Sequence, residues 1–285
     1  MTTVQAAPEV SGRAARRRRR ARAPGHLTAA SGTGLGIAVL WFSLLVLIPL
    51  TAVIIQSSSV GWSGYWDTLT NPQTAAAIRL TVTQSLFVTA INVVVGTLIA
   101  WVLVRDEFFG KRLLEVLIDI PFALPTIVAG LVLLSLYGPK SPIGVDVANT
   151  QRAVFLALAF VTLPFVVRTV QPVLEEIDPE VEEAAASLGA SRFTTFRRII
   201  LPSLAPAIAS GAALSFARAI SEYGSLVLLS GNLAMRTEVT SVRILTYIEN
   251  GDTASAAVVA SVLLAVSFFV IVLLDILQRR VARRG

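Results

Sequence analysis

Arg218 and Glu222 are the residues whose types and spacing most directly suggest chemistry in this 285-residue chain. They lie four positions apart in an otherwise apolar segment, so on a helix both side chains project from one face. Ser215 and Ser225 extend that face into a polar stripe, and Ser221 lies within the same stretch. An arginine there could draw an anion along a transport path. Alternatively, the two charged residues pair with each other or with a neighbouring helix for structural reasons.

A second group of candidates consists of Pro121, Pro125 and Thr126. The prolines stand one helical turn apart, and each removes a backbone hydrogen bond and crowds the preceding turn. A membrane helix that carries them would bend, and its freed carbonyl groups could line a cavity. We interpret the bend as part of a gate or path, with a static kink as the alternative. Asp119, in the same apolar segment as these prolines, and Arg168, in the fourth segment, are expected to form a structural ion pair with each other or with loop residues.

Most covalent chemistry is disfavoured by the residues that the chain lacks. It has no cysteine, which excludes disulfide and thiol chemistry. Its single histidine, His26, lies in an arginine-rich stretch, so a histidine metal site or a Ser-His-Asp hydrolase is disfavoured. No Gly-x-x-x-x-Gly-Lys-Ser/Thr sequence for phosphate binding is present. We therefore expect no enzyme, no metal and no cofactor on this chain, and any energy from ATP must come from another subunit.

The composition predicts a membrane protein that crosses the bilayer several times. The chain is 54% hydrophobic and 15% charged, with a mean hydropathy of +0.73, whereas soluble domains carry about 25% charged residues. A spanning helix needs about 20 mostly apolar residues. Six segments meet this requirement, which predicts an all-α fold with six transmembrane helices. The segments are residues 35–55, 80–104, 113–137, 153–171, 204–230 and 253–277.

Basic residues are unevenly distributed over the connections between these segments. Seven arginines lie between Arg13 and Arg22, and further clusters follow the second, fourth and last segments. Because arginine and lysine concentrate on the inner side of membrane proteins, we expect both termini and the loop at about 172–203 to face the cytoplasm. Residues 1–30 are expected to be a flexible tail whose arginines attract anionic lipid rather than nucleic acid. Residues 31–285 are expected to form the membrane domain.

The cytoplasmic loop between the fourth and fifth segments carries local helix signals. Asp178 can cap a helix that begins at Pro179, and Gly189 suits the left-handed position that follows a helix end. Ser191 can cap a second helix, and we expect Pro202 to end it. The loop is therefore predicted to fold as two short helices joined by a tight turn.

The first of these helices would present a small apolar face made of Val181, Ala184, Ala185 and Leu188. An amphipathic helix of this kind could lie on the lipid surface. Its other residues are acidic, however, and anionic headgroups would repel them. A groove on a protein partner suits the helix better. The acidic residues are Glu180, Glu182 and Glu183.

This loop resembles the EAA loop of binding-protein-dependent ABC transporter permeases, and we call it the EAA loop. The residues that carry the resemblance are Glu183, Ala184, Ala185, Gly189, Ile199, Leu201 and Pro202. In that family the loop is the coupling helix that seats in the ATPase subunit. The resemblance thus implies a type I ABC importer fold and an ATPase-coupling role. The residues to which we assign this role are Glu182, Glu183, Ala184, Ala185, Leu188, Gly189, Phe193, Ile199 and Pro202.

Other stretches resemble the sulfate/thiosulfate permease family, its T-type subunit in particular. They are Gly110–Leu114, Ile118–Thr126, Arg168–Glu175 and Ser215–Gly224, within a region of about 79–250. Ser221 departs from the family pattern, which has glycine there. The resemblance implies an inner-membrane complex with a second, W-type permease subunit, an ATPase homodimer that holds ATP and magnesium, and an external sulfate-binding protein. Membrane lipid surrounds it, and nucleic acid is not a partner.

Two alternatives remain open on the sequence. The first is a permease for molybdate or another oxyanion, because molybdate permeases share part of the pattern. The second is a different class, an ion-gradient-driven secondary carrier or a membrane scaffold. A secondary carrier should have repeated halves with helices broken at matching positions, and only one proline-rich segment is visible. A membrane enzyme is disfavoured because paired carboxylates and histidine clusters are missing from the segments.

Overall fold

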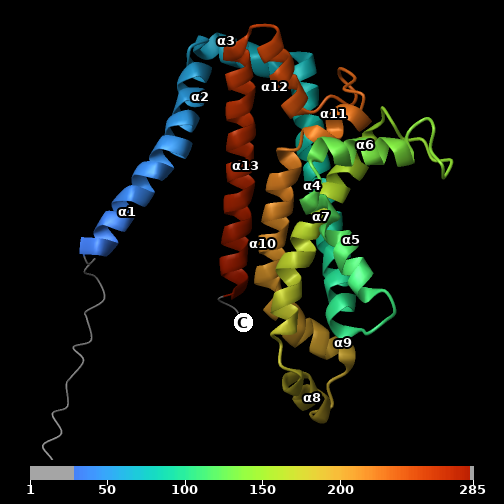
Figure 1. Ribbon diagram of the computed structural model, residues 1–285. Coiled ribbons are helices and arrows are strands. Elements are labelled where there is room, and N and C mark those ends of the chain that lie inside the picture. Colours follow the sequence, from blue (N-terminus) through green and yellow to red (C-terminus); the bar gives the residue numbers. More distant parts are fainter. Residues whose placement is uncertain (1–28, 283–285) are drawn as a thin grey trace, which may run out of the picture. The chain divides into compact units, whose positions relative to one another are not determined.

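A computed structural model of the protein describes residues 29–282, and every regular element among them is a helix (Figure 1). The all-helical fold is therefore confirmed. The expected tail at 1–30 lies almost entirely outside the described residues. By its internal contacts the chain forms two units, residues 1–49 and 50–285. The first unit contains α1 (Ala29–Phe42) and the π-helical segment η1 (Ser43–Leu47), and α2 (Ile48–Ser58) follows.

In the second unit α4, α7 and α10 pack on one another, and α13 packs on α10 (Figure 1). The elements of this unit after α2 are α3 (Gly61–Thr70), α4 (Pro72–Arg105), α5 (Lys111–Ala123), α6 (Thr126–Tyr137), α7 (Gln151–Glu175), α8 (Pro179–Ser187), α9 (Arg192–Thr195), the π-helical segment η2 (Phe196–Ile200), α10 (Leu201–Ile220), α11 (Gly224–Leu229), α12 (Thr240–Glu249) and α13 (Thr253–Ala282).

Within residues 29–282, five helical stretches are long and apolar enough to cross a membrane. They are Ser31–Ser58, Pro72–Arg105, Gln151–Glu175, Arg192–Ile220 and Thr253–Arg280. The prediction that residues 113–137 form one continuous span is wrong, because α5 ends at Ala123 and α6 begins at Thr126. Pro125 disfavours helical geometry in the residue before it, and Leu124 is extended, with φ −87° and ψ 135°.

The prediction of one span over residues 204–230 is also wrong, because α10 ends at Ile220 and α11 is a separate short helix. The expectation that Pro202 ends the helix before it is wrong, because the helical stretch runs through this residue into α10. The N–H of Leu201 donates to the Phe196 carbonyl, a bond five residues long that widens this turn. Pro202 then lies in the first turn of α10, a position that tolerates proline.

The helices of the second unit meet through apolar clusters and a few polar contacts. One cluster lies around the N-terminal half of α4 and includes Val88 with Leu158 of α7. The other lies around its C-terminal half and includes Leu103 with Leu204 of α10. Between them the Asn92 side chain of α4 donates to Thr162 Oγ1 of α7 over 2.8 Å. Such interhelical hydrogen bonds stabilise helix association in lipid.

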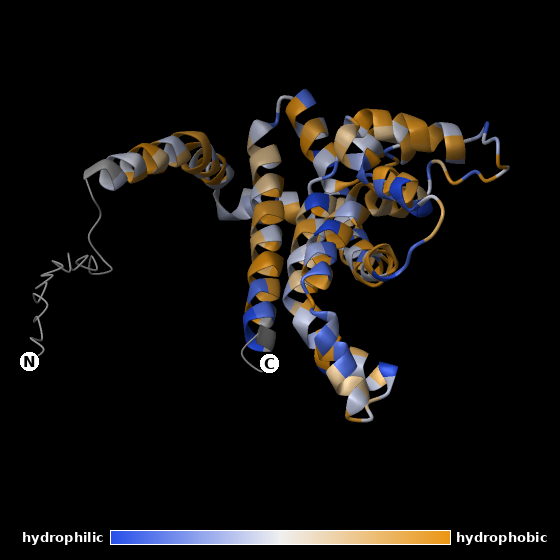
Figure 2. Ribbon diagram, turned by 60° about the horizontal axis from the view of Figure 1, so that its bottom comes forward, coloured by the Kyte–Doolittle hydropathy of each residue, from blue (hydrophilic) through white to orange (hydrophobic). Residues whose placement is uncertain are grey.

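The last helix, α13, has polar ends around a long apolar middle (Figure 2). At its start the N–H of Ser255 donates to Asp252 Oδ1 over 2.9 Å. This hydrogen bond lowers the pKa of the Asp252 carboxyl below its ordinary value. Arg279 and Arg280 lie in the last turn, where positive charge complements the helix dipole. In Figure 1 this end of α13 lies at the same end of the second unit as α8 and α9.

Candidate functional site

Helix α8 of the EAA loop begins and ends at the residues that the sequence predicts. The Asp178 carboxylate accepts a hydrogen bond from the N–H of Glu180 over 2.9 Å. At the other end Gly189 has φ +83°, and the N–H of Ala190 donates to the Ala185 carbonyl over 3.0 Å. This pairing around a left-handed glycine is a common way to close a helix. The predictions for this helix are therefore confirmed at both ends.

The second helix of the loop starts as predicted and continues differently. Ser191 Oγ accepts a hydrogen bond from the N–H of Thr194 over 3.2 Å, so the predicted cap is confirmed. The α-helical part lasts only from Arg192 to Thr195 before η2 begins. Ile199, one of the predicted coupling residues, lies in η2 and is half-buried.

Several apolar side chains of the EAA loop are exposed within the described chain. Leu188 is 89% exposed and Phe193 70% exposed. Ala184 is exposed as well, whereas Ala185 is buried against the rest of the loop. The predicted apolar face therefore exists and is only partly covered by the chain itself. Exposed apolar surface rimmed by charges is typical of sites where a protein partner binds.

The end of α4 contacts the EAA loop, which sequence reasoning missed. Arg105, the last residue of α4, forms an ion pair with Glu182 of α8. Trp101, one turn earlier, packs against Phe196 of η2. Arg105 and Glu182 are 77 positions apart, so no local pattern links them. A groove of about 730 Å³ lies beside these contacts.

Two interruptions of the helices, which we call the two helix breaks, touch each other. The first is Leu124–Thr126, between α5 and α6, and the second is Ser221–Gly224, between α10 and the start of α11. A Cβ atom on Gly224 would collide with the Thr126 side chain and lie 2.9 Å from the backbone nitrogen of Ile127. Glycine at this position thus permits the close approach of α11 to α6. Of the predicted gate residues, Thr126 lies at this contact, Pro125 precedes it in the first break, and Pro121 stays inside α5.

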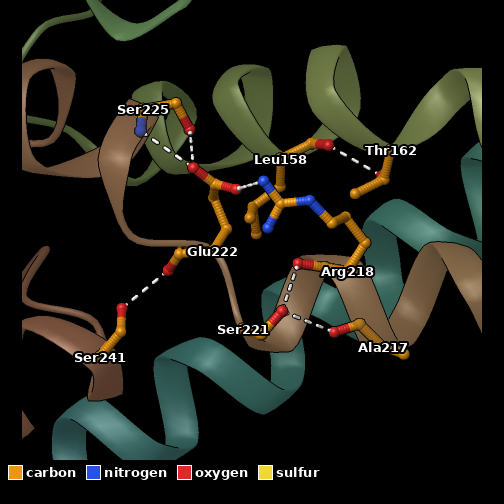
Figure 3. A network of polar contacts seen from close by, with 8 residues as sticks. All are labelled: Leu158, Thr162, Ala217, Arg218, Ser221, Glu222, Ser225 and Ser241. Carbon is orange, nitrogen blue, oxygen red and sulfur yellow. Dashed lines mark hydrogen bonds and ion pairs between the residues drawn. The ribbon is translucent and has the colours of Figure 1, made fainter. Parts of the chain in front are cut away.

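The Arg218–Glu222 pair holds the second break (Figure 3). An Arg218 guanidinium nitrogen lies 2.7 Å from Glu222 Oε2, as an ion pair rather than an aligned hydrogen bond. Glu222 is only 1% exposed, and its Oε1 accepts from both the N–H and the hydroxyl of Ser225, each at 2.9 Å. The same carboxylate therefore both caps α11 and neutralises Arg218. The predicted polar stripe on one continuous helix is wrong, because Ser225 lies on α11.

The serines of the predicted path differ in exposure. Ser221 is exposed, and its hydroxyl donates to the carbonyl of Ala217 over 2.9 Å, which satisfies an acceptor at the end of α10. Ser215 is fully buried, and its hydroxyl has no hydrogen-bond partner within residues 29–282. Arg218 and Ser221 therefore remain accessible at the break, whereas Ser215 and Ser225 face the interior.

The predicted pair of Asp119 and Arg168 is confirmed. Arg168 Nε donates to Asp119 Oδ1 over 2.8 Å, and a second guanidinium nitrogen donates to Oδ2 over 2.6 Å. Two parallel hydrogen bonds of this kind are strong and fix the orientation of both side chains. The pair ties α5 to α7 two residues before Pro121.

Comparison with known sequences identifies the family of this chain's relatives. Residues 92–283 match the family described as "Binding-protein-dependent transport system inner membrane component". The "Sulfate transport system permease protein CysT" of Salmonella typhimurium is 44% identical over 257 residues, which cover 88% of this chain and 93% of that protein. The protein of the same description from Escherichia coli is 43% identical with the same coverage, and that from Synechocystis is 41% identical over 250 residues, 85% of this chain and 87% of that protein.

Solved structures of transporters share the fold. A chain of the bacterial alginate ABC transporter, in complex with its alginate-bound periplasmic protein, superposes with a TM-score of 0.73 at 17% identity. The match covers 88% of this chain and 94% of that chain. A chain of the inward-facing MetNI methionine ABC transporter gives a TM-score of 0.54 at 19% identity, covering 77% and 94%. These likenesses show that the chain shares its fold with chains of ABC transporters.

Proposed function

The chain belongs to the family of binding-protein-dependent transport system inner membrane components, and from this membership we propose that it is the sulfate-transporting permease subunit of an ATP-driven importer. The observation that supports sulfate as the cargo is the 44% identity to a sulfate permease over 93% of that protein's length. The exposed EAA loop and the accessible arginine at the second helix break provide the two parts that such a subunit needs.

Uptake of radiolabelled sulfate tests the cargo. A strain that lacks this subunit should lose sulfate uptake, and the chain supplied in trans should restore it. Competition with thiosulfate and molybdate then defines which anions share the path. Normal sulfate uptake in the deletion strain, together with a loss of molybdate uptake, would show that the cargo is molybdate and not sulfate.

The EAA loop is proposed to seat in the ATPase subunit on the cytoplasmic side, with both termini on that side. Arg192, Arg197 and Arg198 lie in or beside the loop, and Arg279 and Arg280 end α13. Their charge favours the inner face. Because the chain has no cysteine, single cysteines at Leu188 and Trp62 can report the orientation. A membrane-impermeant maleimide should label position 62 in intact cells and position 188 only after lysis.

The two helix breaks are proposed to form the gate of the anion path. Arg218 remains 30% exposed there while Glu222 neutralises it. A partly compensated cation can attract an oxyanion and still release it, whereas an uncompensated buried cation would hold the anion too tightly. The expected result of Arg218→Gln is slower sulfate uptake with normal assembly of the complex. Unchanged uptake in that variant would remove Arg218 from the path.

The complex is proposed to contain a second, W-type permease subunit, two copies of an ATPase that hold ATP and magnesium, and an external sulfate-binding protein. The chain itself then performs no covalent chemistry. Support comes from the family membership and from the uncovered apolar face of α8. Affinity purification of the tagged chain from membranes should recover an ATPase and one related permease. Recovery of the chain without any nucleotide-binding subunit would favour the secondary-carrier alternative.

A further inference from the structure

A charged pair joins the end of α4 to α8 of the EAA loop. The guanidinium of Arg105 pairs with Glu182 Oε1 and lies 5.6 Å from the ring centroid of Trp101. The Arg105 and Glu182 side chains are 23% and 30% exposed, so the charges are partly desolvated and interact more strongly than a surface pair. The aromatic ring fixes the direction of the guanidinium from the other side.

The same turn of α4 also contacts the second arm of the loop. The rings of Trp101 and Phe196 meet edge to face, with centroids 5.5 Å apart and planes at 79°. Both rings pack on the apolar cluster that contains Leu103 and Leu204. The end of α4 therefore contacts α8 through an ion pair and η2 through an aromatic pair.

The loop is joined in the sequence to α7 through a short connection and to α10 through a continuous helical stretch that contains a π-helical turn. Residues 176–178 separate α7 from α8, and a π-helical turn separates α9 from α10. Helix α4 is not adjacent to the loop in the sequence, because α5, α6 and α7 lie between them. The groove of about 730 Å³ is lined by Trp101 and Arg105 together with residues of α8, α9 and η2. Within residues 29–282 the Arg105–Glu182 pair is the ion pair that joins α4 to α8, while Leu103 and Trp101 of α4 belong to the apolar cluster that includes Phe196 and Ile200 of η2.

We propose that Arg105, supported by Trp101, is the positioning residue that makes α4 move together with the EAA loop. This inference rests on the proposed function, in which a partner ATPase drives the loop. Helix α4 has 34 residues and packs on α7, α10 and α12. A displacement at its Arg105 end is therefore passed along the whole unit. Breaking the pair should let the loop move, and ATP be hydrolysed, without the spans following.

The test is a charge swap in the complete complex reconstituted in proteoliposomes. Two quantities are measured: sulfate taken up per ATP hydrolysed, and the amount of ATPase that co-purifies. Arg105→Glu and Glu182→Arg should each lower the uptake per ATP roughly five- to tenfold, in the range of typical coupling between sites. The double variant should restore most of the ratio, because the pair is re-formed with its charges exchanged. Trp101→Leu should give a smaller loss.

A second ion pair near the same end of α4 provides the matched control. Glu107, in the connection that follows α4, and Lys111, at the start of α5, are 2.7 Å apart, and within residues 29–282 neither forms an ion pair or side-chain hydrogen bond with the EAA loop. Their swapped variants should keep the wild-type ratio. The inference is overturned if both single reversals at 105 and 182 keep the ratio within twofold of wild type, or if the double variant is no better than the singles.

The proposed function and this inference fail in distinguishable ways. A wild-type complex that does not take up sulfate contradicts the cargo, and the ratio can then be measured with the oxyanion that is carried. A wild-type complex without ATPase contradicts the coupling role of the loop. Normal wild-type transport with an unaffected Arg105→Glu variant contradicts only the role of Arg105.

Discussion

The EAA loop and the two helix breaks both interrupt the long helices, and they are built in opposite ways. The helices of the loop are capped by hydrogen bonds between residues a few positions apart, such as those of Asp178 and Ser191, and its apolar side chains Leu188 and Phe193 are exposed. The breaks are held by buried contacts, some of them local, such as Glu222 with Ser225, and some between distant segments, such as Gly224 against Thr126. A locally held, exposed loop can enter a partner's groove as a unit. Breaks held by tertiary contacts must move together or not at all.

This contrast predicts its largest effect on stability at Glu222. In Glu222→Gln the Arg218 guanidinium loses its carboxylate, and removal of one partner from a buried pair costs about 3–5 kcal/mol. Since Arg218 is 30% exposed, we expect the lower end of this range. The free energy of unfolding in detergent measures it. The control is Asp275→Asn, in the exposed pair with Arg279 at 2.8 Å, which should cost less than about 1 kcal/mol. Equal costs for the two variants would contradict the contrast.

The contact between the breaks predicts a smaller loss for Gly224→Ala. The added methyl group meets the Thr126 side chain and the backbone of Ile127, and overpacking of this kind costs about 1–3 kcal/mol. Thermal unfolding of the purified chain measures the loss. Gly36→Ala is the matched control, because that glycine lies in α1 with open space around it. Alanine there should be neutral or stabilising. A neutral Gly224→Ala would show that the two breaks are not tightly packed.

In the EAA loop we expect the opposite balance: the substitution Gly189→Val should lower stability modestly and reduce coupling to the ATPase strongly. Gly189→Val forces a β-branched residue into a left-handed conformation, which costs about 1–2 kcal/mol. We expect ATPase retention during purification to fall far more than this cost alone explains, because the turn between the two loop helices is distorted. Gly110→Val is the control, with φ +89° and open space. It should carry the same backbone strain and keep the ATPase.

The smallest effect is expected at the second cap of the loop. Ser191→Ala removes the hydroxyl that accepts from the Thr194 N–H, at a cost of about 1 kcal/mol. Hydrogen exchange of the Thr194 amide should report the local loosening, with little change in the global unfolding transition. Ser187→Ala, whose hydroxyl bonds only to the Glu183 carbonyl within α8, should leave exchange at Thr194 unchanged. Unfolding of the whole chain by Ser191→Ala would mean that the loop is not a local unit.

The same contrast explains which features could be predicted from the sequence. The caps at Asp178, Gly189 and Ser191 were predictable because each acts on its near neighbours in the chain. The breaks within residues 113–137 and 204–230 were missed because apolar composition gives the length of a segment and not its continuity. Glu222 ends α10 through partners that include Ser241, whose hydroxyl donates to the Glu222 carbonyl over 2.7 Å. That contact arises only in the folded chain.

The residues assigned to coupling and those assigned to the path also differ in how well the sequence could predict them. The coupling residues form one stretch of sequence, so a resemblance could mark them. Arg105 and Trp101 escaped notice because their partners, Glu182 and Phe196, are far along the chain. Pro202 was predicted to end the second helix of the loop. It does not, because the wide turn before it accommodates a proline that would otherwise stop the helix.

That wide turn, Phe196–Ile200, has a geometric consequence for the whole subunit. A π-helical turn holds one amino acid more than the α-helical repeat, and each residue of an α-helix rotates the chain by about 100°. One more residue in ordinary α winding would turn everything beyond it by about that angle, whereas the wider turn takes up the extra residue as width. Helix α9 therefore stays continuous with α10 in spite of the surplus residue.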